Sequence, residues 1–159
     1  MDLGFRLNGK DIATECEAQQ TLAEVLRNRL NLNGTKISCE VQVCGACTVL
    51  VDGLPVSSCT YLAYEVQGRD VTTVEGLESA DRTLHPIQQS FIDEFAFQCG
   101  FCTPGMIMSA KALLDDNPDP SQDDIIHHMD GNLCRCTGYV SIVKAIQKAA
   151  EIMRRETAG

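Results

Sequence analysis

The feature that most constrains this chain is a set of closely spaced cysteines in its first third. Cys39, Cys44 and Cys47 follow the spacing C-x4-C-x2-C, and a fourth cysteine, Cys59, comes soon after. This is the plant-type [2Fe–2S] spacing, in which each iron takes two thiolates. A zinc knuckle, a set of disulfides and four buried free cysteines are the alternatives. The iron–sulfur site is favoured because zinc ligands usually come as two separated C-x2-C pairs.

A second set of four cysteines lies in the other half of the chain. Cys99 and Cys102 form a C-x2-C pair, and Cys134 and Cys136 form a C-x-C pair, each just ahead of an expected helix. Packing of the helices would bring both pairs into one site, where N–H groups at the helix starts favour negative charge. This pattern indicates a second iron–sulfur cluster, with structural zinc as the alternative.

Cysteine usage and charge limit the class of protein. Nine cysteines in 159 residues would indicate a disulfide scaffold in a secreted chain, but their clustering in fours fits metal ligation in a reducing compartment better. Only Cys16 is left over, and we expect it to be a small buried or half-buried side chain without chemistry. The net charge of −9 argues against nucleic acid or an anionic membrane as a partner.

The sequence also bears on location. No apolar run approaches the ~20 residues needed to cross a bilayer. The first six residues have neither the basic start nor the apolar segment of a secretory signal. We therefore expect a cytoplasmic protein with no direct membrane contact and no export signal of its own, while export together with a partner that carries the signal stays open.

The first half of the chain predicts a small α+β domain. Alternating residues around Asn8-Gly9 predict a β-hairpin, and the capping box from Thr21 to Glu24 predicts a helix over about 21–30. A second hairpin signal, Asp52-Gly53, follows the cysteine loop. The expected strands are 3–7, 10–16, 48–51, 55–57 and 71–74.

The second half predicts helices alone. His85-Pro86 begins one helix, and Thr103-Pro104 provides the N-cap and first position of the next. Ser121, with Asp124 three residues on, caps a short helix. The expected helices are 86–97, 103 through at least 114, a short one after 121, and 138 to about 155, with Ile92 and Phe95 on the inner face of the first. The fold class is therefore α+β, with the helical domain second.

Three segments together resemble a known family. Cys39-x4-Cys44-Gly45-Ala46-Cys47-Thr48 with Cys59, the segment QCGFCTPG at 98–105 and the segment GNLCRCTGY at 131–139 closely resemble the small iron–sulfur subunit of molybdenum hydroxylases, the xanthine oxidase and aldehyde oxidoreductase family. The likeness spans the whole chain and includes VEGL at 74–77 and LHP at 84–86.

The resemblance implies a fold and two sets of ligands. Residues 1–78 would form a β-grasp plant-type ferredoxin domain and residues 79–159 a four-helix bundle, each holding one [2Fe–2S] cluster. The cluster nearer the flavin would be held by Cys39, Cys44, Cys47 and Cys59, and the cluster nearer molybdenum by Cys99, Cys102, Cys134 and Cys136. Gln98 and Cys136 would approach the molybdopterin.

The resemblance also implies a function. The chain would be the electron-transfer subunit of a complex, without a substrate site of its own. A large subunit with molybdopterin, as its cytosine dinucleotide, would hydroxylate a carbon with oxygen from water, and a medium subunit with FAD would collect the electrons. The assembly would be a heterotrimer or its dimer. A free-standing acidic ferredoxin-like carrier and a zinc-stabilised interaction module remain the alternatives.

Two further features can be stated as expectations. The family usually has glycine two residues before the second cysteine, where this chain has Gln42. We expect a slightly different loop path or a hydrogen bond to a sulfide there, and a changed cluster potential in Gln42→Gly. The histidines His85, His127 and His128 are expected at the surface or at helix caps, because two clusters already use the plausible ligands.

Overall fold

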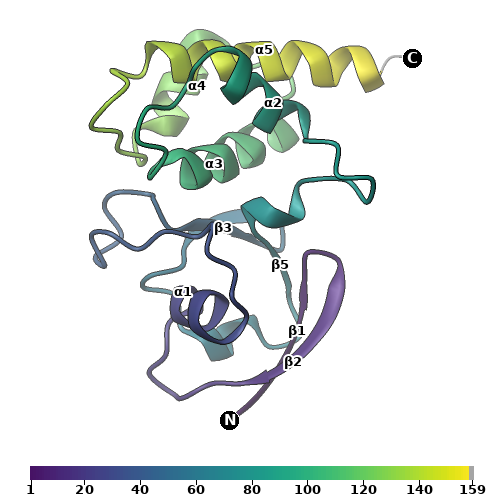
Figure 1. Cartoon of the computed structure of the whole chain (residues 1–159), viewed down its shortest axis with the longest axis vertical. Coiled ribbons are helices and arrows are strands. Elements are labelled where there is room, and N and C mark those ends of the chain that lie inside the picture. The colour runs from purple at the N-terminus through teal and green to yellow at the C-terminus, as the bar shows by residue number, and fades with distance from the viewer. Residues whose placement is uncertain (158–159) are drawn as a thin grey trace.

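A five-stranded sheet forms one layer of the molecule and a group of helices forms the other (Figure 1). The structure is a computed structural model, and it describes residues 1–157. The strand order in the sheet is β2-β1-β5-β3-β4. The strands are β1 (Asp2–Leu7), β2 (Lys10–Glu15), β3 (Thr48–Val51), β4 (Leu54–Ser57) and β5 (Asp70–Thr72).

Both predicted hairpins are confirmed. Asn8-Gly9 joins β1 to β2 and Asp52-Gly53 joins β3 to β4, with positive φ at all four residues, as two-residue hairpin turns require. The strand β5 pairs parallel to β1 and antiparallel to β3. It ends at Thr72, earlier than predicted, because Thr73 instead donates its N–H to the Asn8 side chain (2.9 Å).

A short helix packs on the sheet before the cysteine loop. The helix α1 (Leu22–Glu24) begins at the predicted capping box and continues as a wider π-helical turn, Val25–Arg29. The wider turn is closed by the N–H of Leu30 bonding to the carbonyl of Val25 (3.1 Å). Side chains from α1, the π-turn and the sheet share one core, which includes Leu3, Phe5, Leu22, Leu26 and Val49. Cys16 lies in this core and is 2% exposed, which confirms its prediction as a small buried side chain.

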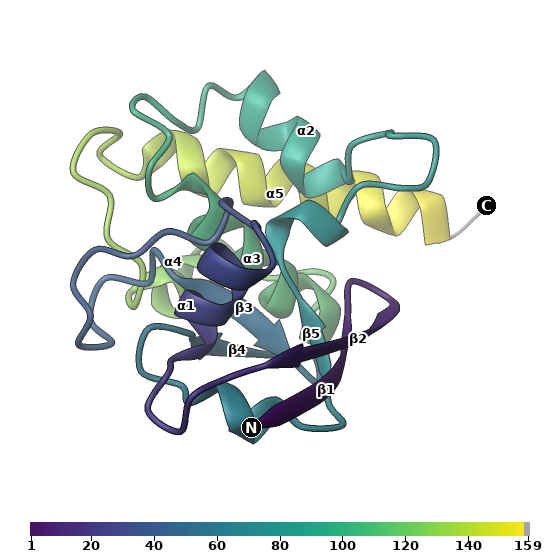
Figure 2. The same cartoon turned by 60° about the horizontal axis from the view of Figure 1, so that its bottom comes forward.

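Four helices share a second core. They lie above the sheet in Figure 1, and Figure 2 shows the same arrangement in a view turned by 60°. The helices are α2 (Pro86–Asp93), α3 (Thr103–Asp116), α4 (Gln122–Met129) and α5 (Val140–Thr157). Their buried side chains include Ile87, Phe91, Met106, Ile125 and Ile146. The chain is therefore mixed, with a sheet in its first half and helices in its second.

The helix boundaries correct the prediction in three places. The helix α2 ends at Asp93 instead of 97, because Phe95 adopts a φ of +51° that no α-helix contains. Ile92 and Phe95 were expected to face inward but are 46% and 80% exposed. The helix α3 has Cys102 at its N-cap, one residue before the expected Thr103. The helix α5 begins at Val140 because Gly138 and Tyr139 both have positive φ.

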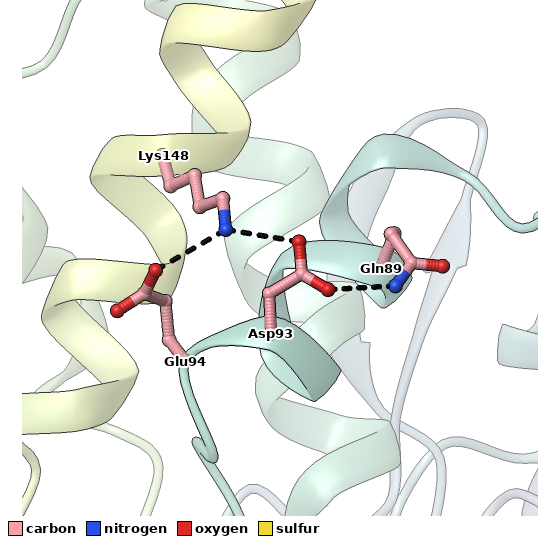
Figure 3. Close-up of polar contacts among 4 residues, drawn as sticks. All are labelled: Gln89, Asp93, Glu94 and Lys148. Carbon is pink, nitrogen blue, oxygen red and sulfur yellow. Dashed lines mark hydrogen bonds and ion pairs between the residues drawn. The ribbon is translucent and has the colours of Figure 1, made fainter.

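A polar cluster fastens α5 to the end of α2 (Figure 3). The Lys148 ammonium lies 2.9 Å from an Asp93 oxygen and 3.3 Å from a Glu94 oxygen. Gln89 donates to the other Asp93 oxygen (2.8 Å). This lysine lowers the pKa of the Asp93 carboxyl, and Asp93 in turn raises the pKa of Lys148.

The two halves pack directly on each other. Leu50 of β3 is buried against Met108 and Ala112 of α3. Gly105 in the first turn of α3 lies so close to the cysteine loop that an added Cβ would come within 2.1 Å of the Gly45 carbonyl oxygen. Within residues 1–157, no helix has the length and hydrophobicity of a membrane span.

Candidate metal centres

The first cysteine loop wraps its backbone around Cys39. Glu40, Gln42 and Gly45 have positive φ, which turns successive N–H groups toward the inside of the loop. The N–H of Val43 donates to the Cys39 sulfur (3.4 Å). The N–H groups of Val41 and then Val43 lower the pKa of the Cys39 thiol to about 6. The loop is therefore built to stabilise a thiolate.

The four sulfurs of the first set fall into two pairs. The Cys44 thiol interacts with that of Cys39 on the loop. Cys47 precedes β3, Cys59 follows β4, and their buried thiols interact with each other. Burial raises the pKa of Cys47 to about 11. The backbone carbonyl of Cys47 accepts hydrogen bonds from the Ser58 hydroxyl (2.6 Å) and N–H (3.4 Å), which hold the second pair together.

Gln42 connects the segments that carry the two pairs. Its φ of +61° is one that glycine adopts more readily, so the backbone keeps a glycine-like path at this position. Its side-chain oxygen accepts a hydrogen bond from the Thr60 hydroxyl (3.3 Å), and Thr60 directly follows Cys59. The loop with three cysteines is thus tied to the segment with the fourth.

The second set also consists of two pairs. The Cys99 and Cys136 sulfurs are 3.6 Å apart and exposed, whereas Cys102 and Cys134 lie deeper and interact with each other. Burial, with Cys134 next in importance, raises the pKa of Cys102 to about 12. Burial also acts to raise the pKa of Cys134, but hydrogen bonds from the Thr137 hydroxyl (3.1 Å) and N–H (3.4 Å) lower it overall.

This pairing fits two irons at each site. Two thiolates on one tetrahedral metal, with bonds of about 2.3 Å, lie about 3.8 Å apart, close to the 3.6 Å between Cys99 and Cys136. A [2Fe–2S] cluster needs two thiolates on each of two irons, and two interacting pairs of cysteines at each site are compatible with that requirement. Bound iron would keep all four thiols deprotonated, whatever their pKa without metal.

The two sets of cysteines are adjacent. The N–H of Leu133, next to Cys134, donates to the carbonyl of Cys44 (2.9 Å). The buried Asn132 side chain donates to the carbonyl of Gly45 (3.1 Å). The loop of the second site therefore lies directly on the loop of the first.

Other candidate residues fall in different places. Gln98 is exposed in the bend after α2, beside the exposed Cys99. The Nδ1 atom of His85 accepts the N–H of Ile87 and caps α2, which confirms a capping role for that residue. His127 is exposed, and His128 is half-buried with Nε2 3.0 Å from the Ser109 carbonyl oxygen.

Sequence reasoning missed two residues at the second site. The Thr137 hydroxyl bonds to the Cys134 sulfur, and the Tyr139 hydroxyl accepts the N–H of Cys134 (3.0 Å). A threonine directly after the C-x-C pair was the available signal, because its side chain can reach a sulfur three residues back.

Comparison with known proteins matches each half of the chain to a family that binds a [2Fe–2S] cluster. Residues 5–76 match the family described as 2Fe-2S iron-sulfur cluster binding domain, and residues 73–147 match the family described as [2Fe-2S] binding domain. The small subunit of nicotine 6-hydroxylase from Paenarthrobacter nicotinovorans is 46% identical over 149 residues, which are 94% of this chain and 89% of that subunit.

Solved structures share the whole fold. Quinoline 2-oxidoreductase from Pseudomonas putida 86 contains a chain with a TM-score of 0.93 and 46% identity, covering 98% of this chain and 96% of that one. The aldehyde oxidoreductase of Desulfovibrio gigas matches with a TM-score of 0.93 and 39% identity, but there the match covers 98% of this chain and only 17% of the longer one. This chain belongs to the small [2Fe–2S] iron–sulfur subunits of the molybdenum hydroxylase family.

Proposed function

We propose that this chain carries single electrons between two partner subunits of a molybdenum hydroxylase through two [2Fe–2S] clusters. The observation that carries the proposal is the contact between the two cysteine-bearing loops, in which the N–H of Leu133 donates to the carbonyl of Cys44 (2.9 Å). An electron moving between the sites then has a path of covalent bonds and one hydrogen bond. The zinc alternative offers no reason for the two sites to touch.

The ligand assignment follows the pairs of sulfurs. One iron of the first cluster would take Cys39 and Cys44, and the other Cys47 and Cys59. In the second cluster the pairs would be Cys99 with Cys136, and Cys102 with Cys134. Such a cluster gains and loses one electron without making or breaking a covalent bond. The residues around it hold the sulfurs, keep water out and donate hydrogen bonds that tune the potential.

The exposed thiols support an assignment of the side that would face the molybdenum partner. Cys99 and Cys136 are exposed beside Gln98, so we assign Gln98 and Cys136 to contact with the molybdopterin of a large subunit, in its cytosine dinucleotide form. Exposed apolar side chains lie close by in the sequence: Phe97, Phe101, Leu133, Tyr139 and Val140. The last three line a groove of about 590 Å³ between α4 and the start of α5. Apolar exposure of this kind is typical of a surface covered by a partner.

The first site would face a medium subunit with FAD. Val41 and Val43 on its loop are 65% and 59% exposed, which is unusual for valine in a protein without a partner. We propose a complex of small, medium and large subunits, as a heterotrimer or its dimer. The cytoplasm suits such a complex, because within residues 1–157 none of the nine cysteines forms a disulfide, and a reducing compartment keeps thiols reduced.

We also propose names and limits for the two domains. Residues 1–78 would be a β-grasp ferredoxin-like domain and residues 79–159 a four-helix-bundle domain, with 158 and 159 outside the described residues. The support is the separation of the two cores, one around the sheet and one shared by α2, α3, α4 and α5.

Purification of the complex tests this function. The chain is expected to co-purify with two larger subunits, molybdenum and FAD, and to give two distinct EPR signals after anaerobic reduction with dithionite. Purification as a single chain with both EPR signals would favour a free-standing carrier. Absence of visible absorption and of both signals would reject electron transfer altogether.

A further inference from the structure

The Cys134 sulfur receives two hydrogen bonds from one residue. The Thr137 hydroxyl oxygen lies 3.1 Å from this sulfur and the Thr137 backbone nitrogen lies 3.4 Å from it. Thr137 follows Cys136, so a single turn of chain closes over the deeper side of the second site. Hydrogen bonds to cluster sulfurs are one of the ways in which a protein sets a cluster's potential.

Tyr139 holds the Thr137 side chain in position at the second site. The N–H of Tyr139 donates to the Thr137 hydroxyl oxygen (3.3 Å), and the Tyr139 hydroxyl accepts the N–H of Cys134 (3.0 Å). A thiolate sulfur has no proton to give, so the Thr137 hydroxyl donates its proton to the sulfur while its oxygen accepts the Tyr139 N–H. The φ of +70° at Tyr139 is unfavourable for a non-glycine residue, so this arrangement is held against a local cost.

The hydrogen bonds make the two thiolate pairs unequal. In the described part of the chain, the Cys134 sulfur accepts the Thr137 hydroxyl and N–H and also interacts with the Cys136 N–H. The exposed Cys136 sulfur interacts with one N–H, that of Cys99, and with the Cys99 sulfur. Cys134 is also the cysteine next to Leu133, whose N–H reaches the first site. The thiolate pair that accepts more hydrogen bonds, Cys102 with Cys134, is therefore the pair connected to the first site.

We infer that the Thr137 hydroxyl, positioned by Tyr139, raises the reduction potential of the second cluster and draws the added electron to the iron bound by Cys102 and Cys134. The inference rests on the proposed function. Two ferric ions, two sulfides and four thiolates form a dianion, and one electron from dithionite or a partner makes it a trianion. No bond is broken and no proton is required. A donor on the sulfur stabilises the more negative form more strongly, so the potential rises.

The test is Thr137→Val in the intact complex, because valine keeps the shape of threonine and loses only the hydroxyl. A redox titration followed by EPR is expected to show about tenfold less favourable reduction of the second cluster, which is a decrease of about 59 mV for one electron. Thr137→Ser keeps the hydroxyl and is expected to restore the wild-type potential. Thr60→Val, also next to a ligand cysteine but without a bond to sulfur, is the matched control and leaves the second potential unchanged.

A second measurement addresses where the electron resides. In the reduced wild type, the β-proton NMR shifts of Cys102 and Cys134 are expected to be those of ligands to ferrous iron. In Thr137→Val, the difference between these shifts and those of Cys99 and Cys136 is expected to become smaller. An unchanged potential in a Thr137→Val protein with full iron content would overturn the inference. Absence of both EPR signals from the reduced wild type would instead reject the proposed function, so the two failures are distinguishable.

Discussion

The backbone N–H of Leu133 donates to the carbonyl oxygen of Cys44 across 2.9 Å. Cys44 belongs to the first set of thiols and Leu133 precedes Cys134 of the second, so one hydrogen bond joins loops that lie almost ninety positions apart in the sequence. In the proposed function, this contact connects the two cysteine sites, whose halves of the chain have separate cores. It also makes the residues around it sensitive to change.

Asn132→Ala is expected to weaken this junction. The buried Asn132 side chain donates to the Gly45 carbonyl, which keeps a bond from the Thr48 hydroxyl (2.8 Å) when the amide is removed. The loss should therefore be that of one net hydrogen bond, about 1 kcal/mol, or a decrease in Tm of about 2–4 °C. Asn33→Ala, at an exposed asparagine, should leave Tm unchanged. Equal Tm values for both variants would contradict the role of Asn132.

Gly105→Ala should disrupt the junction more severely. The added Cβ would come within 2.1 Å of the Gly45 carbonyl oxygen, which is backbone and cannot rotate away. Overpacking of this kind costs about 3 kcal/mol, and we expect a large decrease in Tm with partial loss of iron. Gly131→Ala is the matched control, because a Cβ there meets nothing within 4 Å. A Gly105→Ala protein as stable as Gly131→Ala would show that the loops lie further apart.

Gln42→Gly is expected to change the potential of the first cluster without a loss of stability. Glycine relieves the positive φ, worth about 1 kcal/mol, and this offsets the loss of the exposed hydrogen bond with Thr60. The loop then moves relative to the segment that carries Cys59. EPR-monitored titration of the first signal measures the effect, and Thr60→Val separates the hydrogen bond from the backbone change. An unchanged first potential in both variants would exclude a role for Gln42.

His85 makes the stability of α2 depend on pH. Burial, and next the charge of Lys111, lower the pKa of His85 below its ordinary 6.5, although Asp115 and Glu156 act in the opposite direction. The folded state thus favours the neutral ring that accepts the N–H of Ile87. This stability is fully present above pH 6.5 and is lost as the pH falls through the folded pKa.

The matching variant is His85→Asn, which can cap the helix without titrating. The Tm of the wild type relative to His85→Asn should decrease between pH 7.5 and pH 5.5. Acid damage to the clusters affects both proteins and cancels in the difference. A difference in Tm that is independent of pH would contradict the assignment.

The sequence allowed most of the fold to be predicted where local chemistry determines it. Asn8-Gly9 and Asp52-Gly53 specify their hairpins, and the capping box at Thr21 begins its helix as expected. The end of α2 could not be predicted, because the helical period continues through Ile92 and Phe95 although both are exposed. In a sequence, apolar residues that are exposed in the folded chain look the same as those of a core.

The candidate sites could be predicted as sets but not in their details. The cysteine spacing gives two groups of four, and it does not say which sulfurs pair or that Leu133 meets Cys44. Those relations depend on how α3 packs against the first loop. The hydroxyl of Thr137 was missed because its partner is fixed by the positive φ of Gly138 and Tyr139, which only the folded chain shows.

The most direct test of the account counts iron and EPR signals in single cysteine variants of the intact complex. The wild type and Cys16→Ala should each contain four irons per chain and two signals after reduction with dithionite. Cys59→Ala should lose only the first signal and Cys134→Ala only the second, each with about two irons left, as expected for two irons per cluster. Well under four irons in the wild type, or loss of both signals from either single variant with the fold intact, would contradict two separate clusters.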